Sequence, residues 1–308
     1  MASSMYDLII MGAGPAGLAA SVYATRKRLD FLVLSRDLGG KANYSIKLPQ
    51  MEEHRVIRAR ELVIGYKSRL EHQRSSYRLE GVKSVSHNDG IFAVTTDKGA
   101  TDESSSILVA TGAKNRRLDV PGEARFLSRG LGHSAISYSH LFNGRRVFLT
   151  GDTDRVLHSA LELSIQANSV VLLFLKDGSY TQNLMDLVKS LDRVEVIVDG
   201  SVTEFLGGEY ATEAVISTPD GERTISADGF FVEPEPQGNT EFLEGLVEFH
   251  GAGYIPVDAD SMTTVPGLFA AGDVTGYSYP QVLVALGDGA KAVLSAYNYL
   301  LDNGLGTR

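Results

Sequence analysis

The chain contains no cysteine and no tryptophan among its 308 residues. The absence of cysteine excludes disulfides, thiolate metal sites and cysteine nucleophiles from this sequence, and we assign no metal ligands in it. Lysine and arginine number 29 against 38 acidic residues, which gives a net charge of −9. Nucleic-acid and anionic-membrane binders depend on basic faces, so we expect no nucleic-acid partner and no membrane partner.

Long hydrophobic runs are missing as well. No apolar run approaches the roughly 18 residues that read as a membrane-spanning helix. The first residues lack a basic segment followed by an apolar core, which a secretory signal would need. We therefore expect a cytoplasmic protein. The length itself predicts about two domains.

The beginning of the chain reads as a strand, a glycine-rich turn, a helix and a second strand. Residues 6–11 (YDLIIM) and 31–34 (FLVL) are apolar runs of strand length, and residues 18–28 between them favour a helix. Such apolar runs suit strands that are covered on both faces, as in a parallel sheet. The pattern predicts one βαβ unit.

The turn of this unit has the spacing GxGxxG, with Gly12, Gly14, Pro15, Ala16 and Gly17. In this context the first glycine permits a tight turn, the second lets the backbone approach a pyrophosphate, and the third allows close helix–strand packing. The N-terminus of the helix would present its N–H groups to the anion. The loop therefore predicts a dinucleotide site.

The ribose position is less standard. The second strand ends in Ser35, Arg36 and Asp37, with no acidic residue directly at the strand terminus. Either Asp37 or Ser35 reaches a ribose, or all three residues belong to a solvated loop.

A second unit of the same kind follows about 135 residues later. Residues 146–150 read as a strand, 151–154 as a turn, 155–167 as a helix and 170–175 as a strand. Residues 92–96, 106–110 and 212–228 show the alternation of further strands.

The tail returns to apolar, glycine-rich text with a predicted helix over residues 281–301. We predict an α/β fold with two Rossmann-like nucleotide-binding domains. The first is discontinuous, with residues 1–117 and 247–308, and the second is inserted as residues 118–246.

Several motifs resemble those of the low-molecular-weight thioredoxin reductases and their flavoprotein relatives, over nearly the whole chain. They are GAGPAG at 12–17, GGK at 39–41 where the family has GGQ, ATGA at 110–113, RLDVPGE at 117–123, TVPGLFAAGDV at 264–274, QV at 281–282 and AKAVLSAYNYL at 290–300. The resemblance implies two three-layer ββα domains, FAD in the discontinuous domain and a homodimer. It also implies an inserted domain that ordinarily binds NADPH and carries a CxxC dithiol.

The same resemblance implies a set of FAD-binding positions. They are Gly12, Gly14, Pro15, Ala16, Gly17, Ser35, Arg36, Gly40, Lys41, Asn43, Val82, Ala110, Thr111, Gly112, Gly272, Asp273, Gln281 and Val282. Asp273 would accept a hydrogen bond from a ribityl hydroxyl. The helix that starts near Gln281 would direct its positive end at the flavin and stabilise the anionic reduced form. Pro280 stands where the family has arginine, so one charged contact is lost.

The dithiol is absent. Ser134 and Ser137 stand at the two positions of the family's catalytic cysteines, and Tyr138 stands at the adjacent acid. A serine hydroxyl forms no disulfide and accepts no electrons from a flavin. Both serines are either natural or engineered replacements of cysteine. His133 is either a proton donor near the flavin or an ordinary surface or hinge histidine.

The second nucleotide loop is altered too. Gly151 begins a segment in which Thr153 replaces the glycine that lets a pyrophosphate approach. Asp152 and Asp154 add negative charge where an anion would bind. The family's HRRxxxR motif is replaced by residues 174–180, which retain Lys176 as a cation. We expect no ordinary NADPH-dependent turnover.

These departures leave several hypotheses. The chain resembles cyanobacterial diflavin-linked disulfide oxidoreductases, which hold a second FAD where NADPH would bind. Residues 231–236 (FVEPEP) agree with that branch, whereas the missing dithiol does not. We predict an FAD-containing oxidoreductase that does not use NADPH, with one or two FAD per chain and an unknown donor and acceptor. The alternatives are an inactive flavin-bound scaffold or redox sensor, and a Cys-to-Ser variant of a disulfide oxidoreductase.

Overall fold

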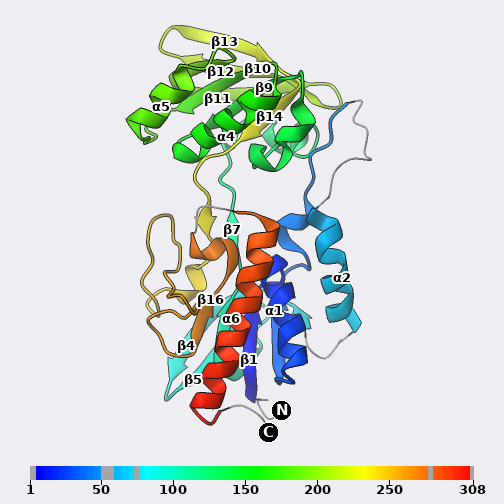
Figure 1. Ribbon diagram of the computed structural model, residues 1–308, viewed down its shortest axis with the longest axis vertical. Coiled ribbons are helices and arrows are strands. Elements are labelled where there is room, and N and C mark those ends of the chain that lie inside the picture. The colour runs from blue at the N-terminus through cyan, green and yellow to red at the C-terminus, as the bar shows by residue number, and fades with distance from the viewer. Residues whose placement is uncertain (1–4, 50–58, 73–76, 277–279, 306–308) are drawn as a thin grey trace. The chain divides into compact units, whose positions relative to one another are not determined.

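The computed structural model describes residues 5–49, 59–72, 77–276 and 280–305 (Figure 1). The chain divides into two compact units. In the described ranges, unit 1 holds residues 5–43, 59–72, 77–114, 237–276 and 280–305, and unit 2 holds residues 44–49 and 115–236.

A parallel sheet forms the centre of unit 1. Its strands are β3 (Tyr77–Leu79), β2 (Phe31–Ser35), β1 (Met5–Met11) and β6 (Thr101–Val109), in that order, with β16 (Leu268–Ala270) beside the end of β6. The first half of β6 instead pairs antiparallel with β5 (Ile91–Thr96), which pairs with β4 (Val82–Asn88). A short antiparallel pair, β7 (Ala113–Lys114) and β15 (Gln237–Gly238), lies where the chain leaves and re-enters the unit.

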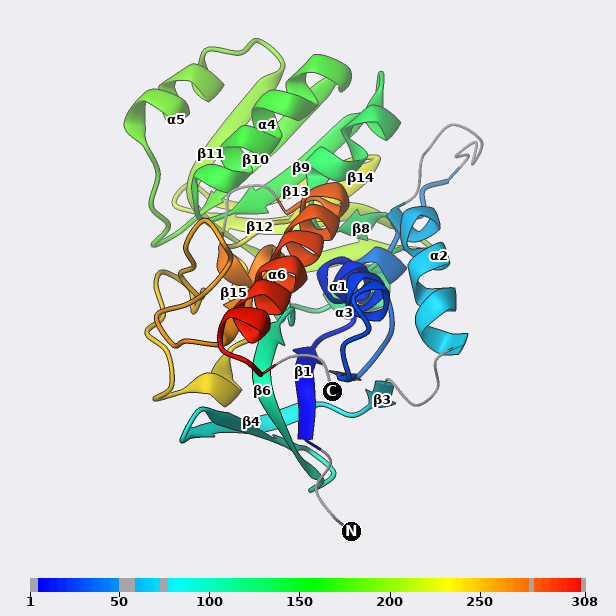
Figure 2. The same ribbon diagram turned by 60° about the horizontal axis from the view of Figure 1, so that its bottom comes forward.

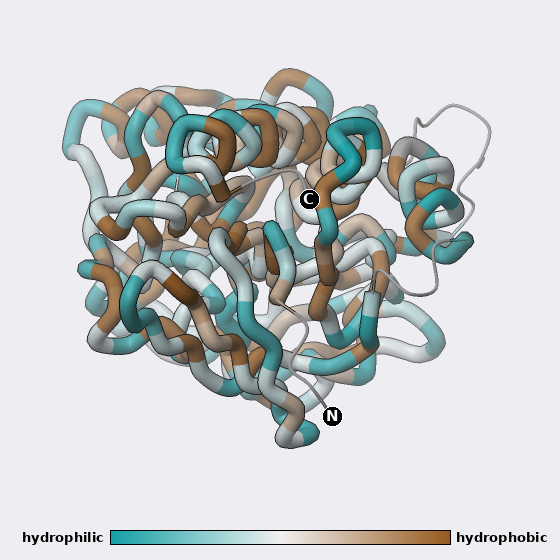
Figure 3. Tube along the Cα trace, turned by 90° about the horizontal axis from the view of Figure 1, so that it is seen from below, coloured by the Kyte–Doolittle hydropathy of each residue, from teal (hydrophilic) through white to brown (hydrophobic). Residues whose placement is uncertain are grey.

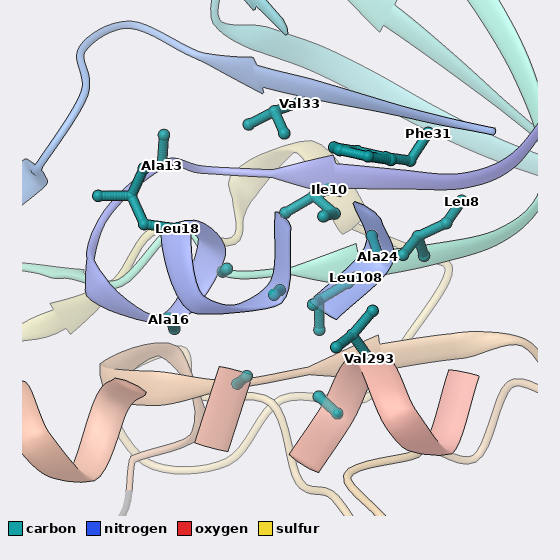
Figure 4. Close-up of a cluster of buried hydrophobic side chains, with 14 of the residues drawn as sticks. Leu8, Ile10, Ala13, Ala16, Leu18, Ala24, Phe31, Val33, Leu108 and Val293 are labelled. Carbon is teal, nitrogen blue, oxygen red and sulfur yellow. The ribbon is translucent and has the colours of Figure 1, made fainter. Parts of the chain in front are cut away.

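Two helices of unit 1, α1 (Pro15–Arg26) and α6 (Val282–Asp302), lie side by side next to β1 (Figure 1). A Cβ added to Gly289 would lie 2.0 Å from the carbonyl oxygen of Ala16, so only glycine lets the helices approach this closely. Figure 4 shows Ile10, Leu108 and Val293 in the cluster of buried side chains that joins the sheet to both helices. The other helices of the unit are α2 (Ala59–His72), η1 (Gly40–Asn43), η5 (Glu241–Leu243) and η6 (Gly272–Thr275).

Unit 2 has a sheet of the same type. Its strands, in order, are β13 (Gly221–Ser226), β12 (Ala211–Thr218), β11 (Val194–Gly207), β10 (Ser169–Leu175), β9 (Arg146–Gly151), β14 (Gly229–Val232) and β8 (Leu131–Gly132). The first half of β11 is parallel to β10, and its second half forms an antiparallel meander with β12 and β13. In Figure 2, α4 (Asp154–Gln166) and α5 (Gln182–Lys189) lie over β9, β10 and β11. Two short helices, α3 (Glu123–Phe126) and η4 (Ala135–Phe142), complete the unit.

The predicted α/β class with two Rossmann-like sheets is confirmed. The apolar runs at 6–11 and 31–34 became the buried strands β1 and β2, and the second strand–helix–strand pattern became β9, α4 and β10. The amphipathic helices α2 and α5 were not predicted from the sequence.

The observed boundaries between the units differ from the expected 117/118 and 246/247. Residues 237–246 belong to unit 1 because β15 pairs with β7, whereas residues 115–117 belong to unit 2. Residues 44–49 also belong to unit 2, since Lys47 forms a β-bridge with Arg129.

Hydrophobic and hydrophilic residues alternate along the chain at short intervals (Figure 3). Over the described ranges, none of the helices combines the length and the apolar character that crossing a bilayer requires.

Candidate functional site

The candidate site lies at one edge of the sheet in unit 1. The strands β1, β2, β6 and β16 are parallel, so their carboxyl ends meet at this edge. Open α/β sheets bind ligands at the carboxyl ends of their strands. Predicted positions lie in four segments at or just after the ends of these strands, which are residues 12–17, 35–43, 110–112 and 272–273.

Two glycines of the GxGxxG loop are required by backbone packing. Gly12 has a φ of +103°, and a Cβ added to it would lie 2.3 Å from the carbonyl oxygen of Ala110. A Cβ added to Gly17 would lie 1.9 Å from the carbonyl oxygen of Gly12. These contacts hold β1, β6 and the first turn of α1 together, so neither position tolerates a larger residue.

Gly14 differs from its two neighbours. A Cβ added to it would have no atom of the described chain within 4 Å, and its φ of −70° is open to any residue. Gly14 is the N-cap of α1, with Pro15 following it at the first helical position. The positive end of the α1 dipole thus lies beside the space of a Gly14 side chain, which no atom of the described chain occupies.

The end of β2 braces this loop. The Ser35 hydroxyl accepts a hydrogen bond from the Ala13 N–H (3.1 Å) and donates one to the Asp37 carbonyl (2.7 Å). The Asp37 carboxylate accepts a bond from the Gly40 N–H at 2.8 Å. Both ribose candidates therefore also stabilise the turn, and their contact with a ribose stays a prediction.

Arg36 points in a different direction. Its side chain is 77% exposed, and its Nε lies 3.5 Å from Asp97. Asp97 also accepts a hydrogen bond from the N–H of Gly81 (3.1 Å), the residue before Val82. The structure thus brings the predicted residues Arg36 and Val82 to one place beside the end of β2.

The segment after β6 is held by a residue that the sequence analysis missed. Asn239 accepts a bond from the Thr111 hydroxyl through its carbonyl (2.7 Å) and donates from its side-chain amide to the Thr111 carbonyl (2.9 Å). Its own N–H donates to the Gly112 carbonyl at 3.0 Å. No sequence signal marks Asn239, because 128 positions separate it from Thr111.

An ion pair joins η1 to η6 beside the GxGxxG loop. The Lys41 ammonium in η1 lies 2.8 Å from the Asp273 carboxylate in η6. Asn43, the last residue of η1, donates from its side-chain amide to the carbonyl of Leu38, before η1, at 2.9 Å. Gly272 has a φ of +75°, and a Cβ added to it would lie 3.1 Å from the Cβ of Ala16.

The first turn of α6 lies close to these groups. Gln281 is the exposed N-cap of α6, and Val282 is its first helical residue. One turn further, burial raises the pKa of Asp288, and the charge of Asp273 raises it again. The positive charge of Lys291 and a hydrogen bond from the Gly272 backbone lower the same pKa.

In unit 2, the two serines at the expected cysteine positions contact each other. The Ser134 and Ser137 hydroxyl oxygens are 2.9 Å apart. Ser134 has a φ of +63°, in the left-handed region, and precedes η4. The N–H of the next residue, Ala135, donates to the buried carboxylate of Glu233, which also accepts a 2.6 Å bond from the Ser159 hydroxyl. The turn therefore has a fixed geometry and carries no thiol.

The neighbours of this turn are engaged by the fold. The His133 ring forms a 2.7 Å hydrogen bond with the carbonyl of Val232. Tyr138, at the family's acid position, stacks on Phe231 with ring centroids 6.4 Å apart, and burial raises the pKa of its hydroxyl. Tyr138 is a neutral phenol at physiological pH and cannot replace a carboxylate.

The altered nucleotide loop of unit 2 differs from the sequence expectation in its electrostatics. The Asp152 carboxylate pairs with Arg116 at 2.8 Å and accepts a bond from the Glu235 N–H. Asp154 accepts two hydrogen bonds from Thr181, from its N–H (2.7 Å) and its hydroxyl (2.6 Å). The charge of Asp152 is paired with a cation, so it repels an anion less than the sequence suggested, whereas Asp154 keeps its charge and is held by neutral donors.

The chain's own side chains fill this loop instead. Thr153 stands at the N-cap position of α4 without a side-chain capping bond, and its hydroxyl donates to the Glu235 carboxylate at 3.2 Å. A Cβ added to Gly151 would lie 2.8 Å from the Cβ of Val156, which stands at the family's alanine. Tyr180, near the end of the former phosphate motif, packs edge-on against Phe174. The residues of this loop therefore contact other residues of unit 2 at the place where the family resemblance implies a nucleotide.

Among the residues that the structure describes, no three or more His, Asp or Glu side chains gather into a group that could hold a metal ion.

Comparisons with known proteins agree with this architecture. The chain is 33% identical to a subunit of the alkyl hydroperoxide reductase of Escherichia coli, over 96% of this chain and 58% of that protein. It is 30% identical to the protein of the same name from Staphylococcus aureus, over 97% of this chain and 60% of that protein. The chain thus spans about three fifths of the length of these curated relatives.

Solved structures give the same result. The thioredoxin reductase of Streptococcus pyogenes matches with a TM-score of 0.86 and 28% identity, over 98% of this chain and 100% of that one. The thioredoxin reductase of Giardia duodenalis matches with a TM-score of 0.85 and 28% identity, over 96% and 99%. A family model described as pyridine nucleotide-disulphide oxidoreductase matches residues 6–289. The chain belongs to the pyridine nucleotide-disulphide oxidoreductase family and has the fold of thioredoxin reductases.

Proposed function

We propose that the chain is an FAD-dependent oxidoreductase that binds one FAD in unit 1 and does not bind NADPH in unit 2. The observation that carries the proposal is the contrast between the two glycine loops. In unit 1, Gly14 is open to a ligand. In unit 2, Thr153 at the equivalent position contacts Glu235.

The residues of unit 1 fit the parts of FAD. The open backbone at Gly14 and the N-terminus of α1 would hold the pyrophosphate. Asp273 would accept a hydrogen bond from a ribityl hydroxyl. The N-terminus of α6, capped by Gln281, would stabilise negative charge on the ring system. When bound, FAD supplies the capacity to take up and release electrons.

The geometry of unit 2 supports the second half of the proposal. A pyrophosphate at the α4 N-terminus would have to displace the Glu235 carboxylate from Thr153 and overcome its charge. The Glu235 carboxylate would oppose the pyrophosphate of a second FAD at this loop in the same way. We therefore favour one FAD per chain over the two that the diflavin branch would have.

Thiol chemistry is excluded for this chain by its sequence. The relatives from E. coli and S. aureus are named for alkyl hydroperoxide reduction, and the structural neighbours are named as thioredoxin reductases. With Ser134 and Ser137 in place of a dithiol, we propose that the chain passes electrons to an external acceptor and reduces no disulfide through this turn. We also propose a homodimer, which sedimentation analysis would test.

Flavin stoichiometry and anaerobic reduction test the proposal together. We expect one FAD per chain, bleaching by dithionite, and no bleaching by NADPH or NADH on the timescale of seconds. Two FAD per chain would support the diflavin interpretation instead. Rapid bleaching by NADPH would refute the second half of the proposal, and a colourless chain that takes up no added FAD would refute the first.

A flavin-bound scaffold or redox sensor is the second candidate, because both the dithiol and the NADPH loop of the family are altered in this chain. Stopped-flow spectra with one-electron and two-electron donors separate the two functions. If the chain is an oxidoreductase, at least one donor should reduce the flavin rapidly. A scaffold should show slow reduction by every donor.

A further inference from the structure

The Lys41–Asp273 ion pair bridges the two sides of the proposed pyrophosphate site. Lys41 belongs to η1, whose Gly40 would place an added Cβ 3.1 Å from the Cα of Gly14. Asp273 belongs to η6, which contacts the first turn of α1 through Gly272 and Ala16. Their 2.8 Å contact therefore lies beside the residues that would meet the anion.

A carboxylate at this place opposes the binding of a pyrophosphate. Asp273 is only 19% exposed, so water screens its charge incompletely. Asp288 adds a second carboxylate close by, and it responds to the charge of Asp273. The facing cations are Lys41, which contacts Asp273 directly, and Lys291, which acts on Asp288. The glutamine of the family's GGQ would provide no charge at position 41.

We propose that Lys41 is a positioning residue that neutralises Asp273 and thereby allows the anionic pyrophosphate of FAD to bind beside a carboxylate. This inference rests on the proposed function, since it requires that unit 1 binds FAD. The inference goes beyond the proposed function because it assigns part of the affinity for FAD to one ion pair, which joins η1 to η6.

A double-mutant cycle measured by FAD binding tests the pairing. The full chain, freed of flavin, is titrated with FAD, and the quenching of flavin fluorescence gives Kd for the wild type, Lys41→Gln, Asp273→Asn and the double variant. We expect Lys41→Gln to weaken binding about tenfold, because an unpaired carboxylate then faces the pyrophosphate. In the Asp273→Asn background the same change should have little effect.

Salt and a matched lysine provide the controls. The loss in Lys41→Gln should shrink as the ionic strength rises from about 0.05 M to about 0.5 M, because salt screens the repulsion. Lys41→Arg should retain the wild-type Kd. Lys27→Gln removes one lysine at the other end of α1, where the ammonium lies 4.6 Å from the Tyr297 ring, and should leave Kd unchanged.

The outcomes separate this inference from the proposed function. If the wild-type chain binds no FAD, the proposed function itself fails. If it binds FAD and Lys41→Gln binds equally well, only the role of Lys41 is refuted. An equal loss in both backgrounds would also refute it, because Lys41 would then act on the cofactor without Asp273.

Discussion

Single residues of one short loop have separate physical roles. Gly12 and Gly17 lie so close to backbone carbonyls that a methyl group cannot enter, whereas a Cβ added to Gly14 would meet no atom of the described chain within 4 Å. Gly12 and Gly17 are therefore required for the stability of the fold. Gly14 leaves room for a ligand.

Alanine substitutions in this loop should separate the two roles. Gly17→Ala must push α1 away from β1, and we expect it to lower the free energy of unfolding by about 3 kcal/mol, as overpacking does. Gly14→Ala should change stability by less than about 0.5 kcal/mol but weaken FAD binding. Urea unfolding and FAD titration measure the two effects. Equal loss of stability in both variants would contradict the assignment.

The carboxylate of Asp288 should make stability depend on pH. Its pKa is raised in the folded state, mainly by burial, so its ionisation destabilises the fold at neutral pH. Asp288→Asn should therefore stabilise the chain at pH 7.5, by about 0.5 kcal/mol since solvent screens a partly exposed group. The gain should disappear as the pH falls through the raised pKa toward the ordinary value of 3.8. Thermal unfolding of both proteins across this range would show a constant difference if the idea is wrong.

At the scale of elements, the turn between β8 and η4 brings two hydroxyls together at the positions where the family resemblance implies a dithiol. Ser134 and Ser137 have hydroxyls 2.9 Å apart, in a turn fixed by the left-handed conformation of Ser134. The carboxylate of Glu233 anchors this turn to β14 and α4.

Replacing both serines by cysteine should create a disulfide. The two side chains already meet, so the Ser134→Cys, Ser137→Cys double variant should oxidise within one chain. Because the chain has no other cysteine, thiol titration before and after oxidation gives a direct count, with each single variant as control. Two thiols that stay free under mild oxidant would contradict the prediction. Disulfide reductase activity in the double variant would favour the Cys-to-Ser interpretation.

Glu233 should be essential for the stability of unit 2. Its removal leaves the Ala135 N–H and the Ser159 hydroxyl buried without an acceptor. We expect Glu233→Ala to cost about 3 kcal/mol in free energy of unfolding. Glu233→Gln keeps one carbonyl acceptor and should cost less. Denaturant titration measures both, and a neutral Glu233→Ala would show that the contacts carry little energy.

At the scale of the whole molecule, the two units should respond differently to ligands. FAD that binds only the folded unit 1 should stabilise it by about 2.7 kcal/mol at a concentration of 100 Kd. The thermal transition of unit 1 should rise with FAD concentration, while NADPH at the same concentration should shift neither unit. Differential scanning calorimetry with each ligand tests this. A shift with NADPH alone would reverse the assignment of the two loops.

The sequence by itself determined the class of fold and the place of the loop. Two local signals were enough, the apolar runs at β1 and β2 and the glycine spacing between them. Both can be recognised within a short stretch of adjacent residues. The serines at 134 and 137 were equally visible, since an absent thiol needs no structure to be recognised. The amphipathic helix α5 was missed because no glycine stop signal follows its last residue, Lys189.

Only the tertiary structure decided which charges meet. Asp273 and Lys41 are 232 positions apart, and Asn239 and Thr111 are 128 apart, so no local pattern couples them. The sequence placed Asp152 and Asp154 against an anion, whereas the fold turned them toward Arg116 and Thr181. Two charged side chains interact strongly only when they are a few ångströms apart. The backbone path decides which ones come that close, and it exists only after the distant strands have paired.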